Sequence, residues 1–192
     1  MVIMNKILNY ITDPKIRFGY LSKLGIAKYI SDKAFVEKEY FLNIGEELDL
    51  LHPQKFNEKL QWLKLYDHNP QYTIMVDKYR ARQFIKDIIG DQYLIPLLGV
   101  WENPDDIDFD LLPDQFVLKC NHNSGTGMCI CKDKKNVDIP RVKRELKKGL
   151  RENYYLRHRE WPYKDVPRRI IAEKYMICLL YTSPSPRDMR RS

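Results

Sequence analysis

The chain is predicted to adopt an α/β fold of the α+β type: a helical N-terminal part, then a small mixed β-sheet with flanking helices. Three observations predict this fold. Apolar residues recur at helical spacing through residues 1–90, with glycines as stops. The stretch 116–130 holds two apolar runs around a polar loop with two glycines, which is typical of a hairpin. A last apolar run at 170–175 predicts a further strand.

The composition favours a globular protein. The chain has 192 residues, of which 44% are hydrophobic, and its 13 tyrosines and three tryptophans argue against disorder. The net charge of +7 permits nucleic acid, an anionic membrane surface or a phosphate-bearing ligand as a partner. Because no dense Lys/Arg block with interleaved aromatic residues is present, nucleic acid is not expected.

The cysteines and the N-terminus indicate a reducing compartment. No CxxC pair or His/Cys cluster occurs, so zinc is not expected and the thiols are predicted to be reduced. The cysteines are Cys120, Cys129, Cys131 and Cys178. Polar residues interrupt the N-terminal apolar stretch, and no run approaches membrane-span length. We therefore predict a cytoplasmic protein without a transmembrane segment. Its basic amphipathic N-terminal part could touch a membrane surface, but packing onto the main body is favoured, because its basic residues are few.

The N-terminal region is predicted to be a series of short helices. Residues 1–30 contain two helical patterns separated at Asp13-Pro14, the second with Gly25 as its stop. Ser31 is predicted to cap the next helix, and Gly45 to end it.

A helix is also predicted over residues 56–66, with Asn57 as its N-cap. Its inward-facing residues are predicted to be Phe56, Leu60, Leu63 and Trp62. For Trp62, packing is favoured over acceptor binding, because an aromatic residue at helical spacing usually belongs to a core.

Lys78 opens a predicted helix that ends at Gly90. The positive end of a helix dipole disfavours a cation there, and a bound phosphate would relieve that conflict. The alternative is a solvated lysine paired with Asp77 or a later carboxylate.

The hairpin loop has the composition of a phosphate-binding loop. Glycines allow backbone N–H groups to approach an anion closely, small polar residues add donors, and Lys119 supplies a charge at the strand end. An ordinary hairpin with an exposed lysine is the equal alternative. The loop is not a Walker loop, because no Gly-Lys-Ser/Thr follows and no helix is signalled directly after it.

One element is predicted before this hairpin in the sequence and one after it. Residues 93–101 are predicted to form a buried strand with a bend at Pro96. A helix from Arg141 to about Leu156, opened by Asp138, carries more cations than carboxylates. That helix is the best candidate for an anion-facing surface, although a solvated face is the more frequent cause of such a pattern.

The composition shifts abruptly after Ile177. Residues 178–188 resemble a translated DNA-library adapter, so we interpret residues 178–192 as a non-native disordered tail on a truncated gene. A natural disordered tail is the alternative. The predicted organisation is a helical region at 1–70, a region at 71–177 that the truncation leaves partial, and this tail.

Three motifs in order resemble those of the ATP-grasp superfamily: Asp77-Lys78 opening a helix, Lys119 before a glycine loop, and an apolar strand running into Glu173-Lys174-Tyr175. The TupA-like branch, named for teichuronopeptide biosynthesis, is a closer resemblance. The stretches that carry it are 55–66, 77–79, 116–122 and 160–164, so it covers roughly residues 30–177.

The resemblance implies ATP and Mg²⁺ as cofactors of the full-length protein. It implies that Lys78 and Lys119 bind the nucleotide phosphates, and that a loop formed by Asn123, Ser124, Gly125, Thr126 and Gly127 covers them. Adenine and ribose would lie against Glu173, Lys174 and Tyr175. The family's magnesium ligands would follow Ile177, so this chain is assigned no metal ligand, and no catalytic residue is assigned.

The function implied is ATP-dependent carboxylate–amine ligation through an acyl phosphate, in cell-surface polysaccharide or teichuronopeptide biosynthesis. The partner would be a small-molecule or polysaccharide-precursor substrate, and the truncated chain is expected to be inactive. The first alternative is a glycosyltransferase, as the branch is often labelled; against it, Asp108-Phe109-Asp110 has the spacing of a nucleotide-sugar site but sits in a connector next to apolar residues. The second is a non-catalytic anion-binding module. The sequence does not predict the oligomeric state.

Overall fold

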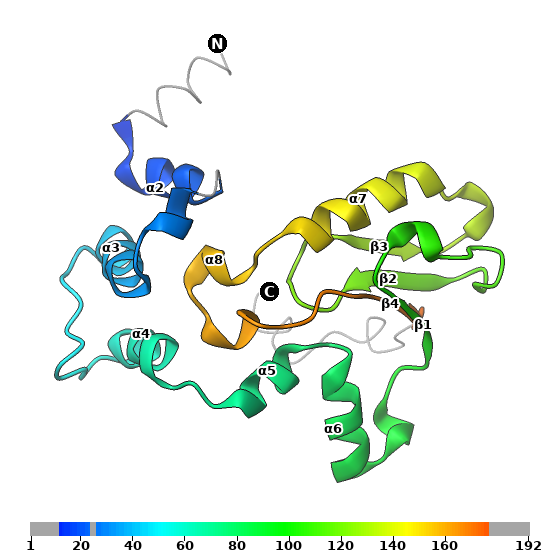
Figure 1. Ribbon diagram of the computed structural model, residues 1–192, viewed down its shortest axis with the longest axis horizontal. Coiled ribbons are helices and arrows are strands. Elements are labelled where there is room, and N and C mark those ends of the chain that lie inside the picture. The colour runs from blue at the N-terminus through cyan, green and yellow to red at the C-terminus, as the bar shows by residue number, and fades with distance from the viewer. Residues whose placement is uncertain (1–11, 24–25, 177–192) are drawn as a thin grey trace, which may run out of the picture.

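The protein is described by a computed structural model over residues 12–23 and 26–176 (Figure 1). The predictions for the first helical pattern, Gly25 and the tail lie outside these residues. The helices are α2 (Pro14–Lys23), α3 (Asp32–Ile44), α4 (Phe56–Tyr66), α5 (Pro70–Val76), α6 (Arg80–Ile89), α7 (Ile139–Arg151) and α8 (Tyr155–His158). The strands are β1 (Leu97–Trp101), β2 (Phe116–Cys120), β3 (Met128–Cys131) and β4 (Ile170–Lys174). Short 3-10 helices are η1 (Ile26–Tyr29), η2 (Asp91–Tyr93), η3 (Pro104–Asp106), η4 (Lys134–Asn136) and η5 (Trp161–Tyr163).

The four described strands form one sheet in the order β1-β4-β2-β3. The α+β fold class is confirmed, and so is the hairpin, in which Lys119 pairs with Met128. The sheet is antiparallel at each described pairing, whereas a mixed sheet was predicted. The physical reason is that β4 enters between β1 and β2 and runs opposite to both, a placement that no local pattern specifies.

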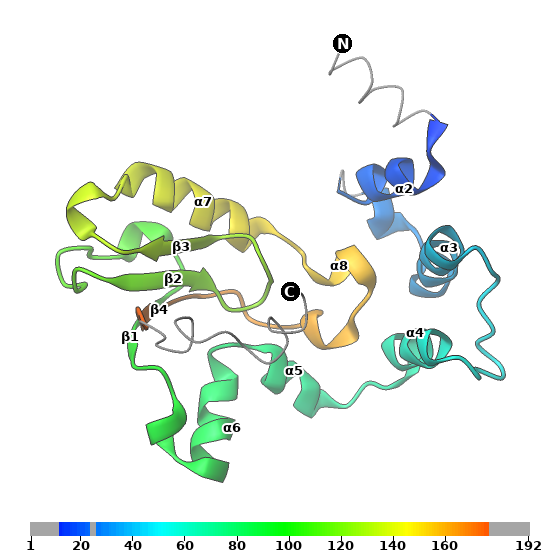
Figure 2. The ribbon, with the colours of Figure 1, turned by 180° about the vertical axis from the view of Figure 1, so that it is seen from behind.

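Strand alternation gives the sheet two different faces. Phe116, Leu118 and Ala172 point to one face and form a buried core with Leu146 of α7. Lys119 and Glu173 point to the other face, where they form an ion pair. Figures 1 and 2 place α7 and α6 on opposite sides of the sheet. The lysine therefore lies on the face away from the α7 core.

The α3 prediction is confirmed, including both ends. Ser31 Oγ accepts a hydrogen bond from Ala34 N at 3.3 Å, and Gly45 ends the helix with φ of 83°. The buried residues Phe35 and Val36 form a second, smaller core under α3.

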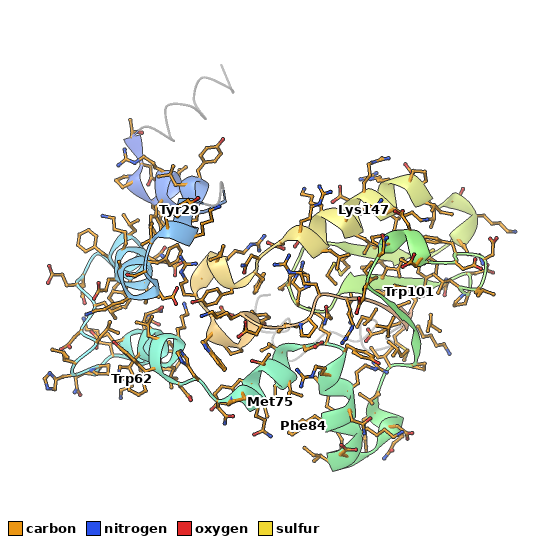
Figure 3. All side chains as sticks on the ribbon, viewed as in Figure 1. Tyr29, Trp62, Met75, Phe84, Trp101 and Lys147 are labelled. Carbon is orange, nitrogen blue, oxygen red and sulfur yellow. The ribbon has the colours of Figure 1, made fainter. Side chains whose placement is uncertain are left out.

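Helix α4 has the predicted bounds, but its predicted inward set is wrong. Phe56, Leu60, Leu63 and Trp62 are all exposed, and only Glu58 is buried. Trp62 contacts Tyr66 at the periphery of the molecule (Figure 3). Glu58 accepts hydrogen bonds from the backbone N–H groups of Gln54 and Lys55, so the N-terminus is satisfied by this carboxylate and not by the predicted Asn57.

Two further boundaries differ from prediction. The strand predicted over 93–101 begins at Leu97, because Tyr93 ends η2 and residues 94–96 connect η2 to the strand; the strand is only partly buried. The helix predicted to reach Leu156 ends at Arg151, while Asp138 caps it as predicted by accepting from Arg141 N at 2.9 Å. No helix in the described ranges is long and apolar enough to span a membrane.

Candidate anion-binding site

Lys78 and Lys119, 41 positions apart in the sequence, lie close together on the sheet face away from α7. Lys119 is the fourth residue of β2, while Lys78 lies in the turn between α5 and α6. The Lys78 ammonium donates to the carbonyl oxygens of Asn121, at 3.3 Å, and Asn123. The structure thus brings the two predicted phosphate-binding lysines together at the entrance of the glycine loop.

Burial lowers the pKa of Lys78, and the nearby charge of Lys119 lowers it further. Both effects disfavour the ammonium form. A bound anion would reverse the second effect, since it places negative charge between two cations. This is the electrostatic condition expected of a site that binds a multiply charged anion.

Glu173 is the counter-ion of this face. Its buried carboxylate lies 2.5 Å from Lys119 Nζ and 3.1 Å from Arg82 Nη1. Arg82 also donates to the Ile95 carbonyl at 2.5 Å, which fixes the guanidinium against the chain leading into β1. One carboxylate therefore neutralises cations from β2 and α6.

Asn121 holds the Lys78 turn against the sheet. Its buried side-chain amide donates to Asp77 Oδ1 and to the Pro167 carbonyl, both at 2.8 Å, and accepts from Arg169 N at 2.6 Å. Asp77 is fully buried, and its Oδ1 also accepts from the N–H of Tyr79 at 2.9 Å. Asp77 and Asn121 thus fix three segments relative to one another around the two lysines.

The predicted loop Asn123–Gly127 is attached to the end of α7. Asn123 Nδ2 donates to Glu152 Oε2 at 3.2 Å, and the Thr126 hydroxyl also donates to that oxygen. Ser124 and Gly125 are exposed at the loop tip. Gly125 and Gly127 have φ of 84° and 62°, the left-handed region that favours glycine. The loop is therefore held at its base and open at its tip.

His122 is a structural residue in this conformation. It is buried, and its Nε2 lies 3.2 Å from the Glu152 carbonyl. Burial lowers its pKa, an effect that outweighs the opposing hydrogen bond to that carbonyl. The neutral imidazole is accordingly favoured near neutral pH.

The three residues expected at adenine and ribose do not share one surface. Lys174 and Tyr175 line a cavity of about 710 Å³ near Pro113 and Lys132, at the sheet end where Phe116 pairs with Lys174. The Glu173 side chain is committed to Lys119 and Arg82 instead. Adjacent residues of a strand point to opposite faces, which accounts for the separation of Lys174 from Glu173, while Tyr175 lies beyond the end of β4.

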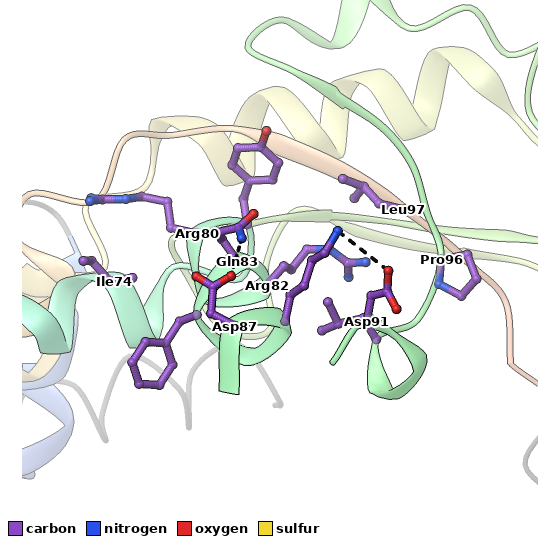
Figure 4. Close-up of a pocket in the computed structure, with 12 residues that line it drawn as sticks. Ile74, Arg80, Arg82, Gln83, Asp87, Asp91, Pro96 and Leu97 are labelled. Atoms are coloured by element: carbon purple, nitrogen blue, oxygen red, sulfur yellow. Dashed lines mark hydrogen bonds and ion pairs between the residues drawn. The ribbon is translucent and has the colours of Figure 1, made fainter. Parts of the chain in front are cut away.

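A larger cavity, of about 810 Å³, lies between α6 and the segment entering β1 (Figure 4). Arg80, Arg82 and Asp87 of α6 line it opposite Pro96 and Leu97. Arg82 connects its wall to Glu173 and hence to the two lysines. The cavity therefore extends the lysine-bearing face toward α6.

The TupA-like ATPgrasp family matches residues 58–181, more than half of the chain, so the protein belongs to this family of the ATP-grasp class. No curated protein and no solved structure matched the chain. The match takes in α4 as well as the sheet and both lysines.

Sequence reasoning missed Arg82, Asn121, Glu152 and Gly149, which hold the lysines, their counter-ion and the loop in place. Asn121 belongs to the stretch 116–122 that carries the family resemblance, whereas Arg82 was signalled only by its position four residues after Lys78. The Asp108-Phe109-Asp110 spacing forms a local turn in which Asp108 Oδ1 accepts from Asp110 N at 2.9 Å. Within the described ranges, no three His, Cys, Asp or Glu side chains are grouped to hold a metal ion.

Proposed function

We propose that this chain is part of a cytoplasmic ATP-dependent carboxylate–amine ligase that acts in cell-surface polysaccharide or teichuronopeptide biosynthesis. Family membership supports the ATP-grasp class. The observation that carries the proposal is the pairing of Lys78 with Lys119 beside an open glycine loop. ATP, as a substrate, would supply the phosphoryl group that activates a carboxylate as its acyl phosphate.

The described residues fit the phosphates of ATP. The cations Lys78, Lys119 and Arg82 outnumber the nearby carboxylates of Glu173 and Asp77, which leaves net positive charge at this site. Lys78 would be stabilised in its charged form, and Lys119 can exchange Glu173 for a phosphate oxygen because Arg82 remains as a partner for Glu173. The exposed loop tip at Ser124 and Gly125 would then close over the phosphates.

The described residues do not fit magnesium in the same way. They include no grouped set of carboxylates, and Glu173 is occupied by two cations. We therefore assign no step to a metal ion and expect the chain as given to bind ATP weakly and to show no turnover.

The proposal is tested by titrating ATP into the ¹⁵N-labelled chain up to millimolar concentration, followed by NMR. Shifts are expected at Lys78, Lys119 and the loop. Lys78→Gln and Lys119→Gln should each weaken binding about tenfold, the value of one charge-assisted phosphate contact. Lys148→Gln, which removes an exposed lysine of α7, is the matched control and should change nothing.

Adenosine, which lacks the phosphates, is used to distinguish the phosphate contacts from binding of the base. Neither lysine variant should change the affinity for adenosine. Equal affinity of ATP for the parent and both lysine variants would refute the phosphate assignment. Inorganic triphosphate should shift the same lysine and loop resonances as ATP.

A further inference from the structure

A separate cavity of about 580 Å³ lies between α2, α3 and the segment joining α7 to α8. Its apolar part is formed by Phe18, Phe35 and Leu156. The Phe18 and Phe35 rings lie 5.0 Å apart, and Phe18 is only partly buried. We refer to this cavity as the α2–α8 cleft. Because Phe35 is 1% exposed and its ring is tilted by 39° from that of Phe18, Phe18 supplies the accessible aromatic surface, which can accept the apolar face of a ring.

Among the described residues that form the polar wall of the α2–α8 cleft, Arg151 is a cation without an ion-pair partner. Glu39 pairs with Lys64, whose Nζ lies 4.0 Å away, and lies 2.6 Å from His158 Nδ1. Glu152 is neutralised by Arg157, whose Nη2 lies 2.7 Å away. Arg151 lines the same wall, is exposed, and makes no ion pair with any described residue. The neutralised carboxylates leave Arg151 as the attractive charge for an anion entering the cleft.

Glu152 forms a direct link between this cleft and the glycine loop. One carboxylate oxygen, Oε2, accepts from Thr126 and Asn123 of the loop, while the other, Oε1, faces Arg157 of the cleft. The α2–α8 cleft therefore lies next to the loop that would cover the phosphates in the proposed reaction. A ligand in the cleft and a nucleotide under the loop would be neighbours.

We propose that the α2–α8 cleft binds the carboxylate-bearing acceptor of the ligation, a sugar acid whose ring lies on Phe18 and whose carboxylate pairs with Arg151. The role of this ligand as the acceptor rests on the proposed function, whereas the binding of a sugar acid depends only on the residues of the cleft. Arg151 supplies the bidentate geometry that recognises a carboxylate, and the aromatic floor distinguishes a ring from a small anion.

The experiment uses D-glucuronate as the probe, with D-glucose and acetate as comparison ligands at matched ionic strength. Binding is followed by NMR of backbone amides and arginine Nε–H groups in the full chain. Glucuronate should shift residues of the cleft, and Arg151→Gln should weaken its binding about tenfold. Lys148→Gln, on the same helix and equally exposed, should leave its affinity unchanged.

Neither comparison ligand should reproduce the glucuronate shifts. Glucose lacks the carboxylate for Arg151, and acetate lacks the ring for Phe18. Acetate binding as strongly as glucuronate, or glucuronate binding that is insensitive to Arg151→Gln, would overturn the proposal. A Phe18→Ala variant that keeps glucuronate affinity would overturn the role of the aromatic floor.

The two proposals fail separately. Lys78→Gln should weaken ATP binding and leave glucuronate binding intact, since Lys78 does not line the cleft. If neither the parent nor any variant binds ATP, but glucuronate still binds in a way that depends on Arg151, the nucleotide assignment is refuted and the cleft is supported as a sugar-acid site. The reverse result would refute the cleft and leave the nucleotide site standing.

Discussion

Gly127 of the glycine loop and Gly149 of α7 pack backbone against backbone. A Cβ atom on Gly149 would lie 2.5 Å from the Gly127 Cα, and one on Gly127 would lie 2.8 Å from the Gly149 Cα. The Cys120 sulfur, 2.8 Å from the position of a Gly149 Cβ, fills the remaining side. This close approach, together with the Glu152 hydrogen bonds, fixes the base of the loop.

Gly149→Ala is expected to destabilise the protein by about 2 kcal/mol, because overpacking against backbone atoms outweighs the gain in helix propensity. Chemical denaturation measures the change. Gly19→Ala in α2 is the matched control, since its Cβ would meet nothing within 4 Å. It should be neutral or stabilise by up to about 1 kcal/mol. Equal effects of the two substitutions would contradict the close packing of Gly149.

Lys119→Met should raise the pKa of Lys78, because it removes the like charge that lowers it. The Lys78 pKa should remain below 10.5, since burial is the larger cause and persists. NMR titration of the lysine ε-methylene signals measures this. Lys148→Met should leave the Lys78 pKa unchanged, and a Lys78 that titrates at its ordinary value in the parent would refute the coupling.

The same pKa shift has a defined effect on stability. Between the folded pKa of Lys78 and 10.5, the unfolded chain binds more protons, so stability rises with pH in that window. Lys78→Met removes this contribution. The parent and the variant should therefore differ in the slope of unfolding free energy against pH just below 10.5.

Glu173→Gln should destabilise the protein by about 2 kcal/mol, because it leaves Lys119 and Arg82 without their shared counter-ion in a partly buried site. Glu102→Gln is the control. Glu102 pairs with Arg169 at 3.6 Å, but its side chain is 79% exposed, so a loss below about 1 kcal/mol is expected. A Glu173→Gln protein as stable as Glu102→Gln would show that the Glu173 ion pairs contribute little.

Asn121→Asp should place a second carboxylate against buried Asp77 and destabilise the protein by about 3 kcal/mol at pH 7. The two carboxylates would share a proton with a pKa above the unfolded value, so the variant should regain stability as pH falls from 7 toward 5. Asn136→Asp is the control, because Asn136 donates to exposed Asp133 at 2.7 Å. Denaturation at several pH values measures both, and parallel profiles would contradict the buried contact.

His158 and His122 should titrate on opposite sides of the ordinary histidine pKa. The hydrogen bond to Glu39 raises the pKa of His158, against burial and the charge of Lys64, with Glu160 as a further raising charge. Glu39→Gln should lower the His158 pKa and leave His122 as an internal reference. NMR of the ring protons measures both. Acidification through the pH 6–7 range should stabilise through His158 and destabilise through His122.

Local sequence patterns correctly predicted those helix ends and turns that depend on interactions within a few residues. Ser31 and Gly45 bound α3 as predicted, because a cap and a left-handed glycine act within one turn. The hairpin at β2 and β3 was predicted for the same reason, as was Lys119 near its end. The order of the three motifs predicted the ATP-grasp superfamily, and further local stretches, among them residues 55–66 and 160–164, predicted the TupA-like family that the family match shows.

The exposed apolar residues of α4 show where local reasoning fails. Periodicity indicates which residues share a face but not whether another element covers it, and Phe56 remains 74% exposed. The direction of β4 between β1 and β2 likewise depends on contacts between distant segments.

The sequence by itself determined the residue types of the candidate site: two lysines, a glycine loop and a strand ending near Glu173. Only the tertiary structure decided that Glu173 neutralises Lys119 together with Arg82, and that Glu152 and Gly149 hold the loop. The physical reason is that charge pairing and close packing depend on distances of a few ångströms between residues far apart in the chain, which residue spacing does not encode.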